Sequence, residues 1–191
     1  GRRTPGYKPE QITDEHFSLE RLLPEIVSEV RRFGTAHDTH IPVIAAGGIY
    51  TGEDIYRIME LGADGVQMGT RFLTVEECTV ADAYKERVLA AKDSDTIVTG
   101  RGSGHPARCL KNKFSRKVRS LEGDMAKNGD ELEQMYLGSL RRAVEGDVDN
   151  GSMMAGQIAA LVRERKTAKD VIDEIVALIK ASPTPLDARN G

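Results

Sequence analysis

Two short apolar runs, separated by the length of one helix, constrain the fold of this chain more than any other feature. The first run spans residues 41–49 and the second spans residues 65–72. Each ends in small residues, namely Gly47, Gly48, Gly69 and Thr70. Runs this continuously apolar favour parallel strands that are covered on both faces. Because glycine lets a ligand approach the backbone closely, the two strand ends together predict a phosphate cradle.

The interval between the runs predicts a helix. Thr51 is suited to cap it, Asp54 completes a near capping box, and Gly62 stops it. One apolar stripe is formed by Ile55, Ile58 and Met59. Strand, helix and strand within about thirty residues indicate a right-handed βαβ unit. A second reading of the glycines stays open at this point, in which they serve only the close packing of helix against strand.

Three segments (residues 42–49, 61–72 and 155–157) resemble the nitronate monooxygenase family, formerly called 2-nitropropane dioxygenases. That family includes the flavin-dependent enoyl-acyl-carrier-protein reductase II. The likeness runs from about residue 19 to residue 179, and it implies an α/β fold, a TIM (β/α)8 barrel that holds FMN without a covalent bond. Carried over by position, the cofactor-binding residues are Gly47, Gly48, Gln67, Met68, Gly69 and Thr70.

The resemblance also implies what this chain does not contain. A whole barrel needs about 250 residues, whereas the chain has 191 residues and two recognisable barrel strands. The family's catalytic histidine belongs to a Gly-Gly-His segment that would lie upstream of Gly1. We therefore expect the C-terminal part of a barrel (its last two strands), inactive alone and completed by an N-terminal barrel half in cis or in trans. A self-sufficient small α/β domain is the alternative.

The pattern along the chain predicts a loop at 1–17, βα units of a barrel with the FMN phosphate site at 18–74, a mainly helical post-barrel region at 75–181 and a tail at 182–191. Ser18 is expected to cap a first helix that Gly34 breaks late and in which Pro24 marks a start or a kink. Further helices are expected at 75–91, 131–144, 154–165 and 168–179, with a short strand at 95–99.

Composition indicates an ordinary globular chain. Apolar residues make up 39% and charged residues 30%, the net charge is −3, and no apolar run reaches the length that crosses a bilayer. We expect a cytoplasmic protein with no membrane partner. The two cysteines, Cys78 and Cys109, are too few for a disulfide framework or a zinc site, so we expect free thiols and no metal.

Seven basic residues and no acidic residue lie between positions 100 and 120. They are Arg101, Arg108, Lys111, Lys113, Arg116, Lys117 and Arg119. The run lacks the interleaved aromatic residues that stack on bases, and eight acidic residues follow in the next thirty positions. We expect no nucleic-acid partner and favour a solvated, locally paired surface. An acyl-carrier protein is the partner that the run would suit if it docks one.

Few other residues are candidates for chemistry. Ser152 and Gln157 are expected to lie near the substrate or the flavin, whereas Met153 and Met154 suit either a pliable apolar surface or core filling before a helix. His105 is read as a surface histidine in a turn, with proton donation at an active-site mouth as the alternative. No role is assigned to His16, His37 and His40.

These observations together predict an FMN-dependent oxidoreductase that converts an alkyl nitronate and oxygen into a carbonyl compound and nitrite. One alternative is an NAD(P)H-dependent enoyl-acyl-carrier-protein reductase on the same scaffold. Two others are a phosphate-binding TIM-barrel enzyme without flavin and a non-catalytic subunit. A homodimer is compatible with either enzyme.

Overall fold

The computed structural model describes residues 18–181, which form two compact units. The predicted N-terminal loop and C-terminal tail, and with them His16, lie outside the described residues. The first unit comprises residues 18–68 and 169–181, and we call it the βα unit. The second comprises residues 69–168, and we call it the hairpin unit. The division falls between residues 68 and 69, and it groups the last helix with the two strands.

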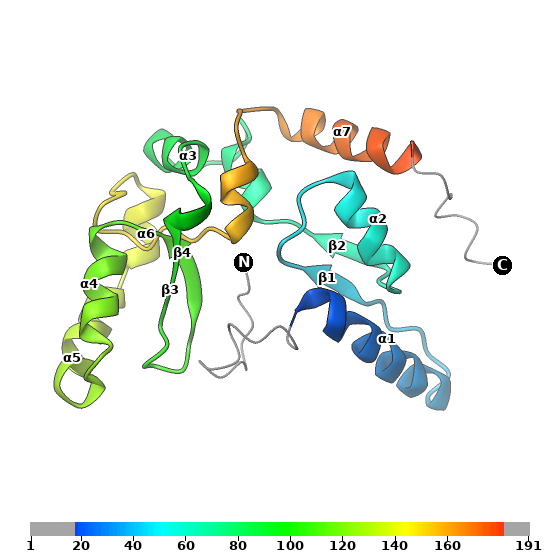
Figure 1. Cartoon of the computed structure of the whole chain (residues 1–191), viewed down its shortest axis with the longest axis horizontal. Coiled ribbons are helices and arrows are strands. Elements are labelled where there is room, and N and C mark those ends of the chain that lie inside the picture. Colours follow the sequence, from blue (N-terminus) through cyan, green and yellow to red (C-terminus); the bar gives the residue numbers. More distant parts are fainter. Residues whose placement is uncertain (1–17, 182–191) are drawn as a thin grey trace. The chain divides into compact units, whose positions relative to one another are not determined.

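The βα unit contains the predicted strand–helix–strand motif. In chain order it consists of α1 (Leu19–Ala36), β1 (Ile44–Ala46), α2 (Gly52–Glu60), β2 (Gly65–Gln67) and, after its first residue, α7 (Ala168–Lys180). The strands β1 and β2 are parallel, with Ala46 opposite Gln67 at their carboxyl ends. Figure 1 shows α1 and α2 lying beside the two strands.

Helix α2 begins and ends as the sequence predicts. The Thr51 hydroxyl accepts the Asp54 N–H, and the Asp54 carboxylate accepts the Thr51 N–H, which confirms the capping box. Gly62 ends the turn after α2 with a φ of 99°. A Cβ at Gly52 would lie 2.4 Å from the Cβ of Leu178, so a glycine at this position lets α7 pack closely against α2.

Helix α1 and strand β1 depart from the prediction. Helix α1 continues through Pro24 and Gly34 to Ala36, and Ser18 makes no side-chain capping bond. Strand β1 alternates, because Ala45 is buried while Ile44 is 55% exposed. The prediction of a sheet covered on both faces is therefore wrong for the described residues. In this part of the chain β1 pairs with β2 alone.

The hairpin unit is built on a pair of antiparallel strands that Figure 1 shows beside α4 and α5. Strand β3 (Thr96–Thr99) pairs with β4 (Ala107–Leu110), and Thr99 lies opposite Ala107. Its α-helices are α3 (Asp82–Leu89), α4 (Lys113–Leu121), α5 (Met125–Tyr136) and α6 (Ser139–Val144). Short 3-10 turns complete it: η3 (Thr70–Thr74), η4 (Asp93–Asp95) and η5 (Gln157–Leu161). The strand predicted at 95–99 is confirmed.

The helices predicted for this region are only partly correct. The segment 75–81 is not helical, because its backbone N–H groups are used elsewhere: Glu76 donates to the Lys166 carbonyl and Ala81 to the Val144 carbonyl. The helix predicted at 131–144 is two helices, α5 and α6, separated by Gly138 with a φ of 66°. The helix predicted at 154–165 is only the short turn η5.

Two elements of the hairpin unit were not predicted, although the sequence carries signals for both. Strand β4 follows β3 after a glycine-rich loop, which is a hairpin pattern. Helix α4 begins at the cap Asn112, whose side chain accepts the Ser115 N–H. The apolar residues Phe114 and Val118 then recur at helical spacing and are buried. The basic composition of this stretch concealed that periodicity.

None of the helices in residues 18–181 is long and apolar enough to cross a membrane. Cys78 and Cys109 are free thiols, as predicted.

Candidate functional site

The carboxyl ends of β1 and β2 meet at one edge of the βα unit. Ala46 and Gln67 are paired, so Gly47 and Met68 are the next residues along the two strands. Gly47 and Gly48 have φ values of 101° and 76°. Residues with a Cβ rarely adopt this backbone conformation. The predicted backbone turn at these two glycines is thus confirmed. Gly48 is exposed, and an added Cβ there would have no heavy atom within 4 Å.

A partly buried carboxylate fixes the backbone that follows these glycines. Asp54 accepts the N–H groups of Tyr50 at 3.1 Å and Thr51 at 2.8 Å. Burial raises the pKa of Asp54, but these backbone bonds and the nearby Arg57 outweigh burial and hold it below its ordinary value. Asp54 is therefore ionised at neutral pH and holds the loop between β1 and α2.

Gly69 and Thr70 begin the hairpin unit directly after β2 and Met68. An added Cβ at Gly69 would have no heavy atom within 4 Å, and the φ of Gly69 is −104°, which other residues adopt easily. The Thr70 hydroxyl accepts the Gly156 N–H at 2.8 Å. A hydroxyl that accepts one hydrogen bond still has a proton to donate. Thr70 is thus bonded to the segment that contains the other predicted contacts.

That segment, residues 151–157, lies mostly in the interior of the hairpin unit. Ser152 is 2% exposed and Met153 is fully buried, so Met153 fills the core as one of the two readings predicted. No helix follows directly, because Met154 forms a bridge with Cys109 and its carbonyl accepts the Tyr84 hydroxyl at 2.7 Å. Gln157 starts η5 and is exposed. The roles predicted for Ser152 and Gln157 remain predictions.

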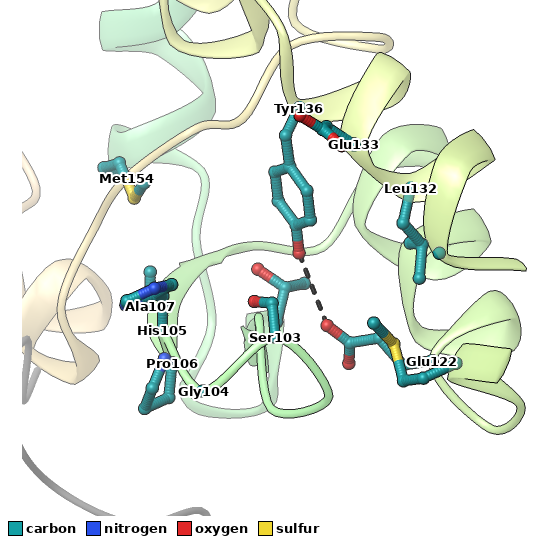
Figure 2. A pocket seen from close by; sticks show the side chains of 13 residues that line it. Ser103, Gly104, His105, Pro106, Ala107, Glu122, Leu132, Glu133, Tyr136 and Met154 are labelled. Atoms are coloured by element: carbon teal, nitrogen blue, oxygen red, sulfur yellow. Dashed lines mark hydrogen bonds between the residues drawn. The ribbon is translucent and has the colours of Figure 1, made fainter.

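A pocket of about 630 Å³ lies within the hairpin unit. Its walls are the loop between β3 and β4, the end of α4, one side of α5, and Met154. His105 lies at this loop, as predicted, and Figure 2 shows it on the pocket wall. Sequence reasoning missed the pocket, because β4, α4 and the true start of α5 are all needed to form it.

The polar end of the pocket is a buried carboxylate. The Glu122 side chain is 5% exposed, and it accepts the Gly100 N–H as well as the Tyr136 hydroxyl at 3.3 Å. Figure 2 shows the Tyr136 hydroxyl directed at this carboxylate. Burial and the neighbouring charge of Glu122 raise the pKa of Tyr136 to about 12, so at neutral pH the phenol keeps the proton that it donates.

Three of the seven residues of the basic run form local ion pairs, as predicted. Lys113 pairs with Asp149 at 2.8 Å, and Lys117 pairs with Glu131 at 2.7 Å. Arg119 lies 3.5 Å from Glu122. In residues 18–181, no group of three or more histidine, cysteine or acidic side chains is arranged to hold a metal ion.

The family of the chain follows from comparison with known proteins. A family model described as nitronate monooxygenase matches residues 1–177, and the chain belongs to this family. A probable nitronate monooxygenase of Staphylococcus saprophyticus is 32% identical over 157 residues, which are 81% of this chain and 41% of that protein. The chain spans less than half the length of the curated relatives it matches.

Two solved structures are similar in fold as well as sequence. FabK from Thermotoga maritima is 41% identical with a TM-score of 0.74, over 85% of this chain and 49% of that one. A nitroalkane oxidase from Streptomyces ansochromogenes is 27% identical with a TM-score of 0.61, over 83% of this chain and 43% of that one. The likeness therefore extends over both units and to two kinds of oxidoreductase.

Proposed function

We propose that the chain is part of an FMN-dependent oxidoreductase that converts an alkyl nitronate and oxygen into a carbonyl compound and nitrite. The family match supports the reaction. The observation that carries the cofactor assignment is the exposed backbone at the ends of β1 and β2, where neither Gly48 nor Gly69 has a neighbour that would meet a Cβ. Phosphate groups bind at such backbone N–H clusters because the donors point at the anion.

The residues present fit the phosphate of FMN. The main chain of Gly48, Gln67, Met68 and Gly69 would hold the phosphate oxygens, and Gly47 would support the turn. The Thr70 hydroxyl would donate its remaining proton to the same group while it accepts the Gly156 N–H. When bound, FMN supplies the redox chemistry by taking electrons from one substrate and passing them to the next. The family's proton-transferring histidine is expected upstream of Gly1.

We further propose that the βα unit is the C-terminal part of a TIM barrel. The exposed face of β1 supports this, since parallel strands are ordinarily covered on both faces. An N-terminal barrel half, in cis or in trans, would then supply the remaining walls of the flavin site. We expect this assembly to be cytoplasmic, and a homodimer is compatible with it.

The second candidate reaction is reduction of an enoyl group on an acyl-carrier protein by NAD(P)H. It is favoured by the likeness to FabK, which has higher identity and a higher TM-score than the nitroalkane oxidase. In that case the acidic carrier would dock on the basic run. The ion pairs of Lys113, Lys117 and Arg119 reduce the charge available for docking. Stronger binding of the carrier at 50 mM than at 200 mM salt would support this role.

A flavin titration tests the proposal. In the chain joined to its upstream barrel strands, Gly69→Val should weaken FMN binding about tenfold or more, since a side chain would enter the space for the phosphate. Riboflavin, which has no phosphate, should lose much less affinity. Gly48→Val should act in the same direction, with added backbone strain because its φ is 76°. Gly123→Val, at an exposed position of ordinary φ, is the control.

Unchanged FMN affinity in both variants would contradict the phosphate site. A colourless protein that releases no flavin would favour the non-flavin enzyme or the non-catalytic subunit.

If the protein binds flavin, two substrate assays on the flavin-loaded protein distinguish the two reactions. One assay uses an alkyl nitronate with oxygen, and the other uses an enoyl thioester with NAD(P)H. The 191-residue chain alone should bind FMN weakly and turn over neither substrate.

A further inference from the structure

The pocket of the hairpin unit has the size and composition of a ligand site. Its volume of about 630 Å³ lies within the range of about 300 to 1,000 Å³ that is usual for small-molecule sites. The walls are mainly apolar, with Met125, Leu132 and Met154 as the largest aliphatic side chains. Figure 2 shows Met154 and Leu132 on opposite sides of Tyr136. Methionine side chains adapt to irregular flexible ligands, so these walls suit an alkyl chain.

The charged residues of the pocket determine which polar group a bound ligand can carry. Two carboxylates, Glu122 and Glu133, line it together with His105, and no lysine or arginine side chain is among its lining residues. Arg119 contacts Glu122 at 3.5 Å, but it does not line the pocket. A buried carboxylate favours a cation or a hydrogen-bond donor and repels another carboxylate. A fatty-acid anion is therefore disfavoured.

The Glu122 carboxylate has capacity for one more donor. A carboxylate has about four acceptor positions. The structure assigns three donors to it: the Gly100 N–H, the Tyr136 hydroxyl and the weakly placed Arg119 guanidinium. The first two hold the carboxylate at the wall, so a ligand would meet a fixed acceptor.

We propose that this pocket binds a primary alkylammonium ion with a chain of about ten carbons, its ammonium group on Glu122 and its chain between Met125, Leu132 and Met154. This binding goes beyond the proposed oxidoreductase activity and does not depend on it. An alkylamine is protonated at neutral pH, as the lysine side chain is. Charge and shape then act together, because the carboxylate lies at one end of an apolar space.

The test is methyl NMR of the full chain with its methionine methyl groups labelled. Met125 and Met154 line the pocket, whereas Met59 and Met68 belong to the βα unit and serve as references. Decylamine should shift the two pocket methyls in a saturable way and leave the references unchanged. Decanoate should bind at least about tenfold more weakly, because a buried site amplifies charge repulsion. Equal affinities for the two ligands, or no saturable shift with decylamine, would overturn the proposal.

Two variants and one control variant locate the ligand. Gly129 lines the pocket, and an added Cβ there meets no atom within 4 Å, so Gly129→Leu should fill the space and abolish the shifts. Gln134→Leu places the same side chain at an exposed position of α5 and should bind decylamine normally. Glu122→Gln should lower the ratio of decylamine affinity to decanoate affinity at least about tenfold. The buried Met153 methyl reports whether each variant is folded.

Unchanged decylamine affinity in the folded Gly129→Leu protein would overturn the proposal. The same conclusion would follow if the amine preference survived in folded Glu122→Gln. Where a variant does not fold, the comparison of decylamine with decanoate on the unaltered chain still decides whether the proposal holds.

Discussion

The hairpin unit and the βα unit cover their apolar side chains to different degrees. In the hairpin unit Val88, Cys109, Val118, Ala143 and Met153 are fully buried. Of the ten large apolar side chains that are exposed among residues 18–181, seven belong to the βα unit. They are Ile26, Phe33, Ile41, Ile44, Ile172, Val176 and Leu178. Burial of apolar surface is the main favourable term in folding, so the hairpin unit has the larger internal source of stability.

The two units also differ in how they treat polar groups. Several polar groups are buried in the hairpin unit, and two of them bond its own carbonyls: Asn112 bonds two, and the Lys85 ammonium donates to the Val75 carbonyl at 2.8 Å. The βα unit instead places its special backbone, Gly47 and Gly48, at an exposed edge. Satisfied buried polar groups specify one packing arrangement. We conclude that the hairpin unit is held by its own interior, whereas the βα unit is shaped to present a strand edge.

The largest effect is expected from Asn112→Ala in the hairpin unit. The variant loses the cap of α4 and leaves the carbonyls of Val148 and Gly151 without their donor, which should lower the free energy of unfolding by about 3 kcal/mol. Urea unfolding followed by circular dichroism measures the loss. The exposed Asn150→Ala is the matched control and should cost less than about 1 kcal/mol. A loss in Asn112→Ala no greater than in this control would break the contrast between the units.

A smaller effect is expected from Gly52→Ala in the βα unit. The added Cβ would lie 2.4 Å from the Cβ of Leu178, so α7 must move, at a cost of about 2 kcal/mol. Hydrogen exchange of the α7 amides should accelerate, while the β3–β4 amides keep their protection. Gly123→Ala, with its nearest neighbour at 3.6 Å, should change neither. If both sets of amides exchanged faster, α7 would not belong to the βα unit alone.

The Thr70–Gly156 bond should contribute about 1 kcal/mol to the hairpin unit. Thr70→Val keeps the shape of the side chain but leaves the Gly156 N–H without its acceptor at 2.8 Å. The hydrogen-exchange rate of the Gly156 amide should rise about fivefold. Thr70→Ser retains the hydroxyl and should exchange like the unaltered chain. Equal exchange in the valine and serine variants would show that the hydroxyl does not hold Gly156.

The smallest effect concerns pH and the Asp54 carboxylate of the βα unit. Its folded-state pKa lies below the ordinary value, so the stability it contributes is fully present above the unfolded-state pKa of about 3.9 and is lost as pH falls through the folded-state pKa. Asp54→Asn should therefore be less stable at pH 7, by about 1 kcal/mol or less. The two proteins should converge as pH falls towards 3. Urea midpoints at both pH values measure this, and a constant difference would contradict the assignment.

The local sequence predicted the features that depend on nearby residues. The Thr51–Asp54 box, the strands at 44–46 and 65–67, the turn at Gly47–Gly48 and the helix at 168–180 all follow from spacing, capping or backbone freedom. The two glycine-rich strand ends predicted a phosphate cradle, and the family resemblance assigned its six residues, which are still predictions. Their placement on strand ends is confirmed for Gln67 and the glycines after β1, because parallel pairing fixes which edge they share.

Only the tertiary structure decided the features that depend on distant partners. The segment 75–81 reads as helix, but its N–H groups bond carbonyls at positions 144 and 166. Residues 154–165 read as helix, yet Met154 is held extended by Cys109 and Tyr84. The pocket forms only when Glu122, Tyr136 and the hairpin loop lie close together in space. They are separated in the chain, so no local sequence pattern predicts the pocket. Local propensity amounts to tenths of a kcal/mol per residue, whereas an unpaired buried backbone group costs about 1 to 3 kcal/mol, so the distant bonds prevail.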